Sequence, residues 1–151
     1  MLWKGVFMTK DREIYFQELL NCVKILEKNI INLPPVGSQR KYKIQKYDDK
    51  LEKFVLVANR KGHLNLKNLT YMMISHSLGA LLRLDCNGAP HDEVPTPHLH
   101  IFDKEHDNGR LAIGLSDLGL DLSQDLIASL IWFLDENKVE HGDVLIEESL
   151  V

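Results

Sequence analysis

Two amphipathic stripes bracket a middle section of short strand-like runs, and this order constrains the fold more than any other feature of the sequence. In residues 11–31, apolar side chains recur every three or four positions, which is the spacing of one helix face. Leu126, Leu130 and Leu134 repeat in the same way. Two prolines at 34–35 end the first stripe, because proline cannot continue a helix. We therefore expect a helix near each end of the chain.

The middle section alternates apolar runs with turn-forming residues, as strands do. The expected strands are a hairpin from Tyr42 to Val57 through Asp48 and Asp49, a short strand around Leu64 and Leu66, and runs at Leu69 to His76, Ala80 to Cys86, His98 to Asp103 and Arg110 to Leu115. Asp121, with Gln124 reaching back, is expected to cap the second helix. The order predicts an α+β fold: an N-terminal helix, an antiparallel meander of about five to seven strands, and a C-terminal helix packed on one face.

Length and composition fit one domain. The chain has 151 residues, of which 44% are hydrophobic and 26% charged, an ordinary globular balance. We expect the domain to span residues 8–151, with 1–7 as an N-terminal extension. Cys22 and Cys86 have no paired spacing, so a reducing, cytoplasmic setting is expected. No apolar run approaches the roughly 20 residues that span a bilayer, so we expect no membrane association.

Charge is unevenly distributed along the chain. Residues 38–67 carry nine basic and three acidic side chains, a local net charge of +6, whereas residues 85–151 carry 15 acidic and three basic ones, a local net charge of −12. A basic sheet face could follow a phosphate backbone, and the acidic part could dock a basic partner. The candidate nucleic-acid-binding residues are Arg40, Lys41, Lys43, Lys46, Arg60 and Lys61. Two solvated faces with a chance bias are the alternative.

Reactive side chains concentrate between Arg83 and His100. Arg83 and Asp85 stand two residues apart in one expected strand, as do His98 and His100 in another. Each pair therefore projects to one face, with Cβ atoms roughly 6.6 Å apart. If the two strands are neighbours, all four side chains share a face, and His91 hangs over it from a proline-rich loop.

This cluster suits two chemistries. His98 and His100 could act as general base and acid on a phosphate, with Arg83 stabilising the developing charge, in a metal-independent ribonuclease. Alternatively, the two histidines could hold a divalent metal, completed by Glu105, Asp85 or His91.

The metal is disfavoured by the neighbouring sequence. Asp103 should point to the opposite strand face, Glu105 falls at a turn, and Arg83 places a fixed positive charge beside any cation. We therefore expect no metal and no other cofactor. In a third, structural interpretation the cluster is a polar network that fixes the loop. His63, His76, His106 and His141 are isolated in the sequence and are expected at the surface or in loops.

The motif Arg83-Leu-Asp85…His91…Pro97-His98-Leu-His100 resembles that of a family of small proteins of unknown function found in Gram-positive bacteria and their prophages. The resemblance extends from Tyr15 to about Asn137, although the apolar 72–75 stretch replaces an expected basic residue. It implies the fold and the cluster but no activity. The segment is also similar to that of certain small ribonuclease-type toxins of toxin–antitoxin pairs, an analogy only.

Three functional hypotheses follow. The first is a ribonuclease-like toxin in which Arg83, Asp85, His91, His98 and His100 are catalytic, and whose partners are RNA and a cognate antitoxin. The second is a non-enzymatic phage or host-defence protein that binds another protein through its charged faces. The third is a metal-binding protein built on the His-x-His pair.

Overall fold

The computed structural model describes residues 3–62, 68–118, 122 and 125–148. Helix α1 (Trp3–Asn21) and helix α2 (Leu126–Glu136) are combined with a large sheet and a small one. The α+β class predicted from the sequence is therefore confirmed. In the described part of the chain, neither helix is long and apolar enough to cross a membrane.

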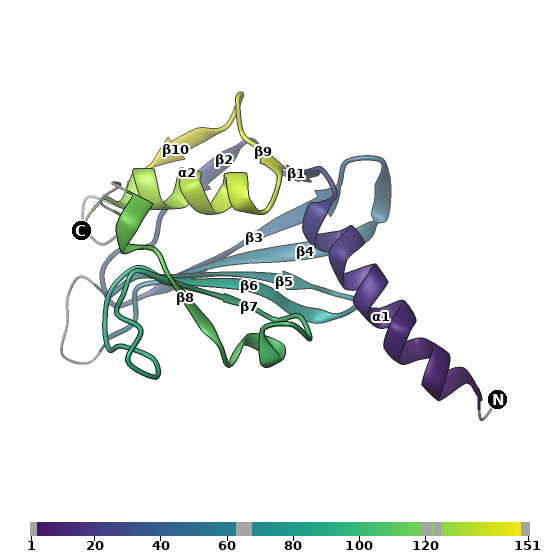
Figure 1. The fold of residues 1–151 in the computed structure, drawn as a ribbon. Coiled ribbons are helices and arrows are strands. Elements are labelled where there is room, and N and C mark those ends of the chain that lie inside the picture. Colours follow the sequence, from purple (N-terminus) through teal and green to yellow (C-terminus); the bar gives the residue numbers. More distant parts are fainter. Residues whose placement is uncertain (1–2, 63–67, 119–121, 123–124, 149–151) are drawn as a thin grey trace.

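The large sheet has eight strands, in the order β8-β7-β6-β5-β4-β3-β1-β9. They are β1 (Lys24–Leu26), β3 (Gln39–Lys46), β4 (Asp49–Asn59), β5 (Thr70–Ser75), β6 (Gly79–Asp85), β7 (His98–Ile101), β8 (Ala112–Gly114) and β9 (Val139–Glu140). Neighbours pair antiparallel, except that β1 and β9 are parallel. Strands β2 (Ile30–Asn32) and β10 (Leu145–Glu147) form a separate parallel pair. The run from β3 to β8 is the predicted meander (Figure 1).

The sheet is larger than the predicted five to seven strands because the first helix ends earlier than its stripe. Helix α1 stops at Asn21, and residues 24–26 leave it to form β1 against β3. The apolar residues Val23, Leu26 and Ile30 fit a three- and four-residue spacing by coincidence. They belong to the connection and to the short strands β1 and β2. At its other end α1 begins at Trp3, so residues 3–7 continue the helix, which projects beyond the sheet (Figure 1).

The second helix is where the stripe predicts it, with a different cap. Asp125 is its N-cap, and the carboxylate accepts a hydrogen bond from the backbone N–H of Ala128 at 3.0 Å. The predicted capping residues, Asp121 and Gln124, lie outside the described residues, as does the short strand predicted around Leu64 and Leu66. The predicted hairpins β3–β4 and β5–β6 are confirmed. A longer turn with a 3-10 segment (Asp107–Gly109) joins β7 to β8.

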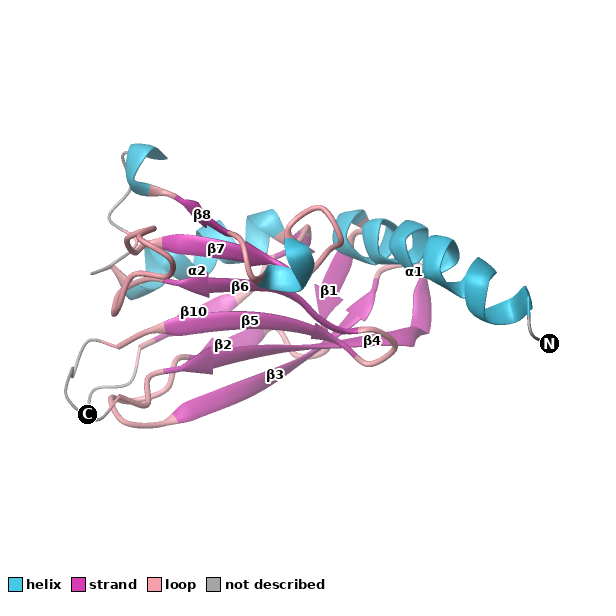
Figure 2. Cartoon of the chain, turned by 60° about the horizontal axis from the view of Figure 1, so that its bottom comes forward, coloured by secondary structure: helices cyan, strands magenta, loops and turns pink. Residues whose placement is uncertain are grey.

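The two faces of the sheet have different roles. One face is the core side: Tyr71, Leu84 and Leu99 are cross-strand neighbours and buried, and the Tyr71 hydroxyl donates to the Leu126 carbonyl of α2 at 3.1 Å. Because side chains alternate along strands, the residues between them face away from the helices. This outer face is seen in Figure 2, where α2 lies behind the strands.

Candidate functional site

Strand pairing brings the predicted cluster together on the outer face. Arg83 in β6 is the direct cross-strand partner of His100 in β7, and Asp85 is the partner of His98. The expectation that these four side chains share a face is therefore confirmed, while their predicted catalytic roles stay predictions. His98 and His100 are each only 1% exposed, because the 86–97 loop and the β7–β8 turn fold over them.

The ring nitrogens of both histidines converge on one carboxylate oxygen. Asp85 Oδ2 lies 2.9 Å from Nε2 of His98 and 3.2 Å from Nε2 of His100. These three atoms lie within 4.8 Å of one another. The other carboxylate oxygen, Oδ1, accepts a hydrogen bond from the Thr70 hydroxyl at 3.3 Å, which fixes the carboxylate plane.

The opposite nitrogen of each ring faces a backbone carbonyl. Nδ1 of His98 lies 3.1 Å from the Val94 oxygen, and Nδ1 of His100 lies 2.7 Å from the Gly109 oxygen. A carbonyl oxygen can only accept, so each Nδ1 must carry the proton. In a neutral imidazole the other nitrogen, Nε2, then carries a lone pair. The loops thus aim two lone pairs at a carboxylate.

The turn that supplies the Gly109 carbonyl depends on glycine. Gly109 has φ +88°, and a Cβ added there would lie 2.6 Å from the ring of Phe102. A side chain at this position would therefore be both strained and in collision. The turn at Asp107–Gly109 thus holds the Gly109 carbonyl against Nδ1 of His100.

Arg83 supplies the positive charge that the cluster contains. Its Nη2 donates to Asp85 Oδ2 at 3.2 Å and to Nε2 of His100 at 3.0 Å. The latter contact requires a lone pair on that nitrogen, since a guanidinium can only donate. Nε of Arg83 is buried and has no hydrogen-bond partner among the described residues, although the side chain as a whole is one-third exposed.

The charges in the cluster shift two pKa values. Burial acts to raise the pKa of Asp85, but the charge of Arg83 and the contacts of the carboxylate with His98 and Arg83 outweigh it, and the pKa is lowered from its ordinary value. Burial, aided by the charge of Arg83, lowers the pKa of His100. At neutral pH the pair is therefore a carboxylate beside a neutral imidazole, consistent with the lone pair on Nε2.

His91 lies at the rim of the cluster, as predicted. Its ring centroid is 5.0 Å from that of His100 and 6.4 Å from that of His98, and its side chain is 39% exposed. Nε2 of His91 donates to the Arg110 carbonyl at 2.7 Å. This histidine is held edge-on to the buried pair, but no nitrogen of its ring joins their convergence on Asp85.

A second group of potential ligands, Asp103, Glu105 and His106, lies in the β7–β8 turn. In this group the carboxylate accepts hydrogen bonds from N–H donors. Asp103 Oδ1 accepts from the backbone N–H of His106 at 2.8 Å and from its Nδ1 at 2.6 Å. His141 likewise pairs with Asp135 at 2.6 Å. His106 and His141 lie in loops, as expected, and the turns around them bring an aspartate to each. His63 lies outside the described residues.

Strand alternation divides the six predicted nucleic-acid-binding residues. In the register of the sheet, Lys41 pairs with Val57, Val57 with Met72, and Met72 with Arg83. Lys41 and Lys43 therefore lie on the face that carries the cluster. Arg40, Lys46 and Arg60 alternate with these positions and point to the other face of the sheet. Arg40 donates to the Asn32 carbonyl and Arg60 to the Pro34 carbonyl. Lys61 lies beyond the end of β4.

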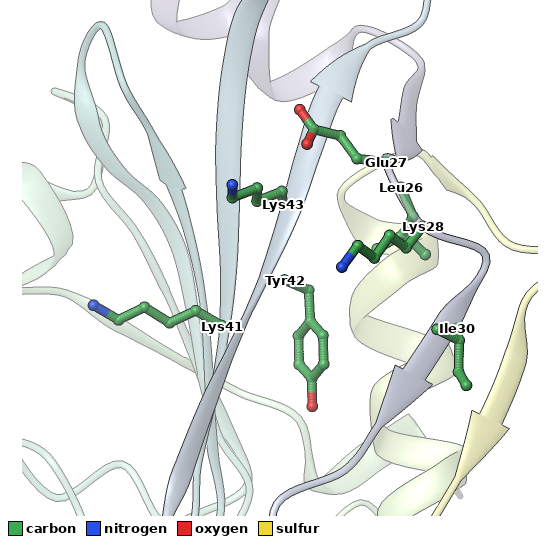
Figure 3. Close-up of a pocket in the computed structure, with 7 residues that line it drawn as sticks. All are labelled: Leu26, Glu27, Lys28, Ile30, Lys41, Tyr42 and Lys43. Carbon is green, nitrogen blue, oxygen red and sulfur yellow. The ribbon is translucent and has the colours of Figure 1, made fainter.

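Lys41 and Lys43 line a pocket beside β3, but their ammonium groups do not converge on it. It has a volume of about 320 Å³ and lies between β3 and the β1–β2 connection, around the ring of Tyr42. Figure 3 shows Lys41 and Lys43 turned away from Tyr42, across the strand. Lys28 alone reaches toward it from the other side. The pocket is therefore not a cradle for an anion.

Sequence reasoning missed Thr70 and the Val94 and Gly109 carbonyls as parts of the site. Thr70 could have been found only from the β5–β6 register, in which it is the partner of Asp85. The two carbonyls belong to loops whose path the sequence does not reveal. These groups set the orientation of the carboxylate and of both imidazoles.

Comparison with known proteins gives a family without an activity. No curated protein and no solved structure matches the chain. A family model described as "Family of unknown function (DUF6978)" matches residues 12–139, which include every residue of the cluster. This confirms the resemblance to a family of unknown function that the histidine motif indicated. Since the match covers most of the chain, the protein belongs to the family of unknown function DUF6978.

Proposed function

We propose that the chain is a divalent-metal-binding protein whose ligands are Asp85, His98 and His100. The observation that carries the proposal is the direction of the imidazole lone pairs. When both imidazoles are neutral, their Nδ1 protons are committed to carbonyls and both Nε2 lone pairs face a carboxylate oxygen. The donor at this point is Nη2 of Arg83, which reaches His100 and Asp85. Lone pairs that face one another repel, and a cation at their convergence removes the repulsion.

The distances suit first-row metals. Zinc binds nitrogen at about 2.0 to 2.1 Å and carboxylate oxygen at about 2.0 to 2.2 Å, so two ligands at octahedral or tetrahedral angles stand about 2.8 to 3.5 Å apart. The separations of 2.9 and 3.2 Å between Asp85 and the histidines lie within this interval. Metal-bound histidines also characteristically donate their second N–H to a carbonyl or carboxylate. Both histidines do so here.

The alternative of a metal-free acid–base pair fits this geometry less well. A general acid and a general base must reach opposite sides of a substrate phosphate. His98 and His100 are instead almost fully buried and present the same nitrogen to the same oxygen. The expectation of a metal-free protein rested on Asp103 and Glu105 as the nearest acids and on the fixed positive charge of Arg83, which in the structure is paired with Asp85. Asp85, brought in by strand pairing, supplies the carboxylate that they cannot.

The test is a calorimetric titration of the metal-stripped full-length protein with zinc. We expect one zinc per chain, and a loss of affinity of at least about 100-fold when both His98 and His100 are replaced by alanine, because two of three ligands are removed. The Asp85→Asn variant keeps the shape of the side chain and removes its charge. It should show a smaller but clear loss while its circular dichroism spectrum is unchanged.

The matched control is His106→Ala, which removes a histidine of the second potential ligand group. It should bind zinc as the unaltered protein does, because His106 directs a proton to Asp103. The proposal is wrong if the unaltered protein binds no zinc, or if the double histidine variant binds it equally well.

A further inference from the structure

The proposed metal centre would lack a full set of protein ligands. Among the described residues, Asp85, His98 and His100 are the three potential ligands whose atoms converge at this centre. Zinc takes four ligands, and sites with three protein ligands keep the fourth position for water or for an exogenous ligand. The side chains of Arg83 and Asp85 are 33% and 17% exposed, whereas those of the two histidines are 1% exposed, so solvent meets the centre on the side of Arg83 and Asp85.

The charge around the open position selects the ligand. A divalent ion, the Asp85 carboxylate and the Arg83 guanidinium sum to a net charge of +2 when both imidazoles are neutral. In the described part of the chain, Asp85 is the only carboxylate that contacts Arg83, His98 or His100. A partly buried surplus of this size is costly unless an anion compensates it. A dianion does so fully.

Arg83 is placed to hold such an anion. Its Nη2 lies 3.0 to 3.2 Å from two of the proposed ligand atoms, so a metal at this centre would replace these two hydrogen bonds and leave Nη2 beside it, free to bind the metal's further ligand. Its Nε is buried and unpartnered among the described residues. Arginine presents several N–H donors in a plane that matches phosphate oxygens.

We infer that the open position of the metal takes a phosphate group, bound jointly by the metal and by Arg83. This inference rests on the proposed metal site. The phosphate can belong to a small molecule or to a nucleic acid. The outer face favours the second source, since Lys41 lies three strands from Arg83, about 14 Å at ordinary strand spacing. Half-exposed Val57 and Met72 lie between them.

The test uses the full-length protein loaded with cobalt(II), whose visible absorption reports a change of ligand at the metal. Inorganic phosphate should change the spectrum in a saturable way. Arg83→Met should weaken phosphate binding by about tenfold or more, and Arg83→Lys by less, because lysine keeps the charge and loses the planar fork. The matched control is Arg110→Met, which removes a nearby exposed arginine that pairs with Asp107 and should have no effect.

The outcomes separate the two proposals. A protein that binds no cobalt overturns the metal site and this inference with it. A protein that binds cobalt, with a spectrum unchanged by phosphate, overturns only the inference. Equal phosphate binding by Arg83→Met and by the unaltered protein overturns the assignment to Arg83.

The source of the phosphate is read from competition. A single-stranded RNA oligonucleotide with a 5′-phosphate should displace inorganic phosphate, and replacement of Lys41 and Lys43 by alanine should weaken the oligonucleotide while leaving inorganic phosphate unaffected. An oligonucleotide that fails to compete excludes nucleic acid as the source. Phosphate bound at the metal then identifies a small phosphate ester.

Discussion

Two buried polar clusters lie at different places in the sheet. Only one of them is closed, in the sense that each of its donors has an acceptor within the protein. At β1, the ammonium group of fully buried Lys24 donates to the carbonyls of Leu20, Cys22 and Asn137 at 3.2, 3.2 and 2.7 Å. An ammonium has three N–H donors, so every donor is used. The carbonyls belong to the C-terminal ends of α1 and α2, where orphan carbonyls favour a cation.

At β6 and β7 the balance of hydrogen-bond donors and acceptors differs. Asp85, His98 and His100 present more lone pairs than protons at the point where they meet, and Arg83 alone offsets the difference. A buried polar group that is fully paired needs no explanation beyond stability, whereas converging acceptors that share one donor, Nη2 of Arg83, indicate a site for a further cation. By burial and charge alone, Lys24 is the stronger candidate for a functional site. The comparison of hydrogen-bond donors with acceptors favours the Asp85, His98 and His100 cluster instead.

The largest expected effect is the loss of the closed cluster. Lys24→Met should lower the free energy of unfolding by roughly 3 kcal/mol, because three buried carbonyls lose their donor. Urea unfolding followed by circular dichroism measures this. Zinc affinity should be unchanged. A stability loss below about 1 kcal/mol would show that the carbonyls find other partners, and the cluster would then not be structural in the sense argued here.

The pH dependence of that loss sharpens the comparison. Burial lowers the pKa of Lys24 from 10.5 to about 8, partly offset by Cys22 and aided by Lys138. Between these values the unfolded chain binds more protons than the folded one, so stability rises with pH. The free energy of unfolding of the unaltered protein, measured relative to that of Lys24→Met, should therefore rise between about pH 8 and 10.5, by at most about 3 kcal/mol. A flat difference over this window would contradict the lowered pKa.

Zinc should stabilise the molecule through the open cluster alone. At a free zinc concentration 100-fold above the dissociation constant, the free energy of unfolding should rise by about 2.7 kcal/mol in the unaltered protein and in Lys24→Met. In Asp85→Asn at the same zinc concentration the rise should be much smaller. Equal stabilisation of Asp85→Asn would place the zinc elsewhere.

The smallest effect concerns the orientation of the carboxylate. Thr70→Val removes the hydroxyl that donates to Asp85 Oδ1 at 3.3 Å and keeps the size of the side chain. Groups that orient metal ligands typically contribute about 10-fold or more to affinity. Because this hydrogen bond is long, we expect a loss of about 3- to 10-fold in a zinc titration. An unchanged affinity would mean that the strand backbone alone holds the carboxylate.

Much of the site could be predicted because it depends on strand periodicity. Two-residue spacing placed Arg83 with Asp85 and His98 with His100, and the proline-rich loop between the strands made them neighbours. Lys24 shows where periodicity fails, because the helical stripe of residues 11–31 includes it although it lies in β1. Spacing alone cannot separate a helix from a short helix followed by a strand when the apolar residues fit both.

The geometry of the loops could not be predicted from the sequence. The protonation of His98 and His100 is set by carbonyls of Val94 and Gly109, which come from two different loops. Their positions depend on tertiary packing, such as that of Gly109 against Phe102. The sequence therefore predicted which side chains meet, but not which nitrogen of each ring faces the carboxylate. The choice between a metal site and an acid–base pair depends on that nitrogen.

The most direct test of this account is a long-range ¹H–¹⁵N correlation spectrum of the histidine rings at neutral pH, recorded without metal and with one equivalent of zinc. We expect His100 to carry its proton on Nδ1 and a lone pair on Nε2 without metal, and the Nε2 signals of both His98 and His100 to shift to metal-bound values with zinc. The signals of His106 should not change. Protons on Nε2 of both His98 and His100, unaffected by zinc, would contradict the account.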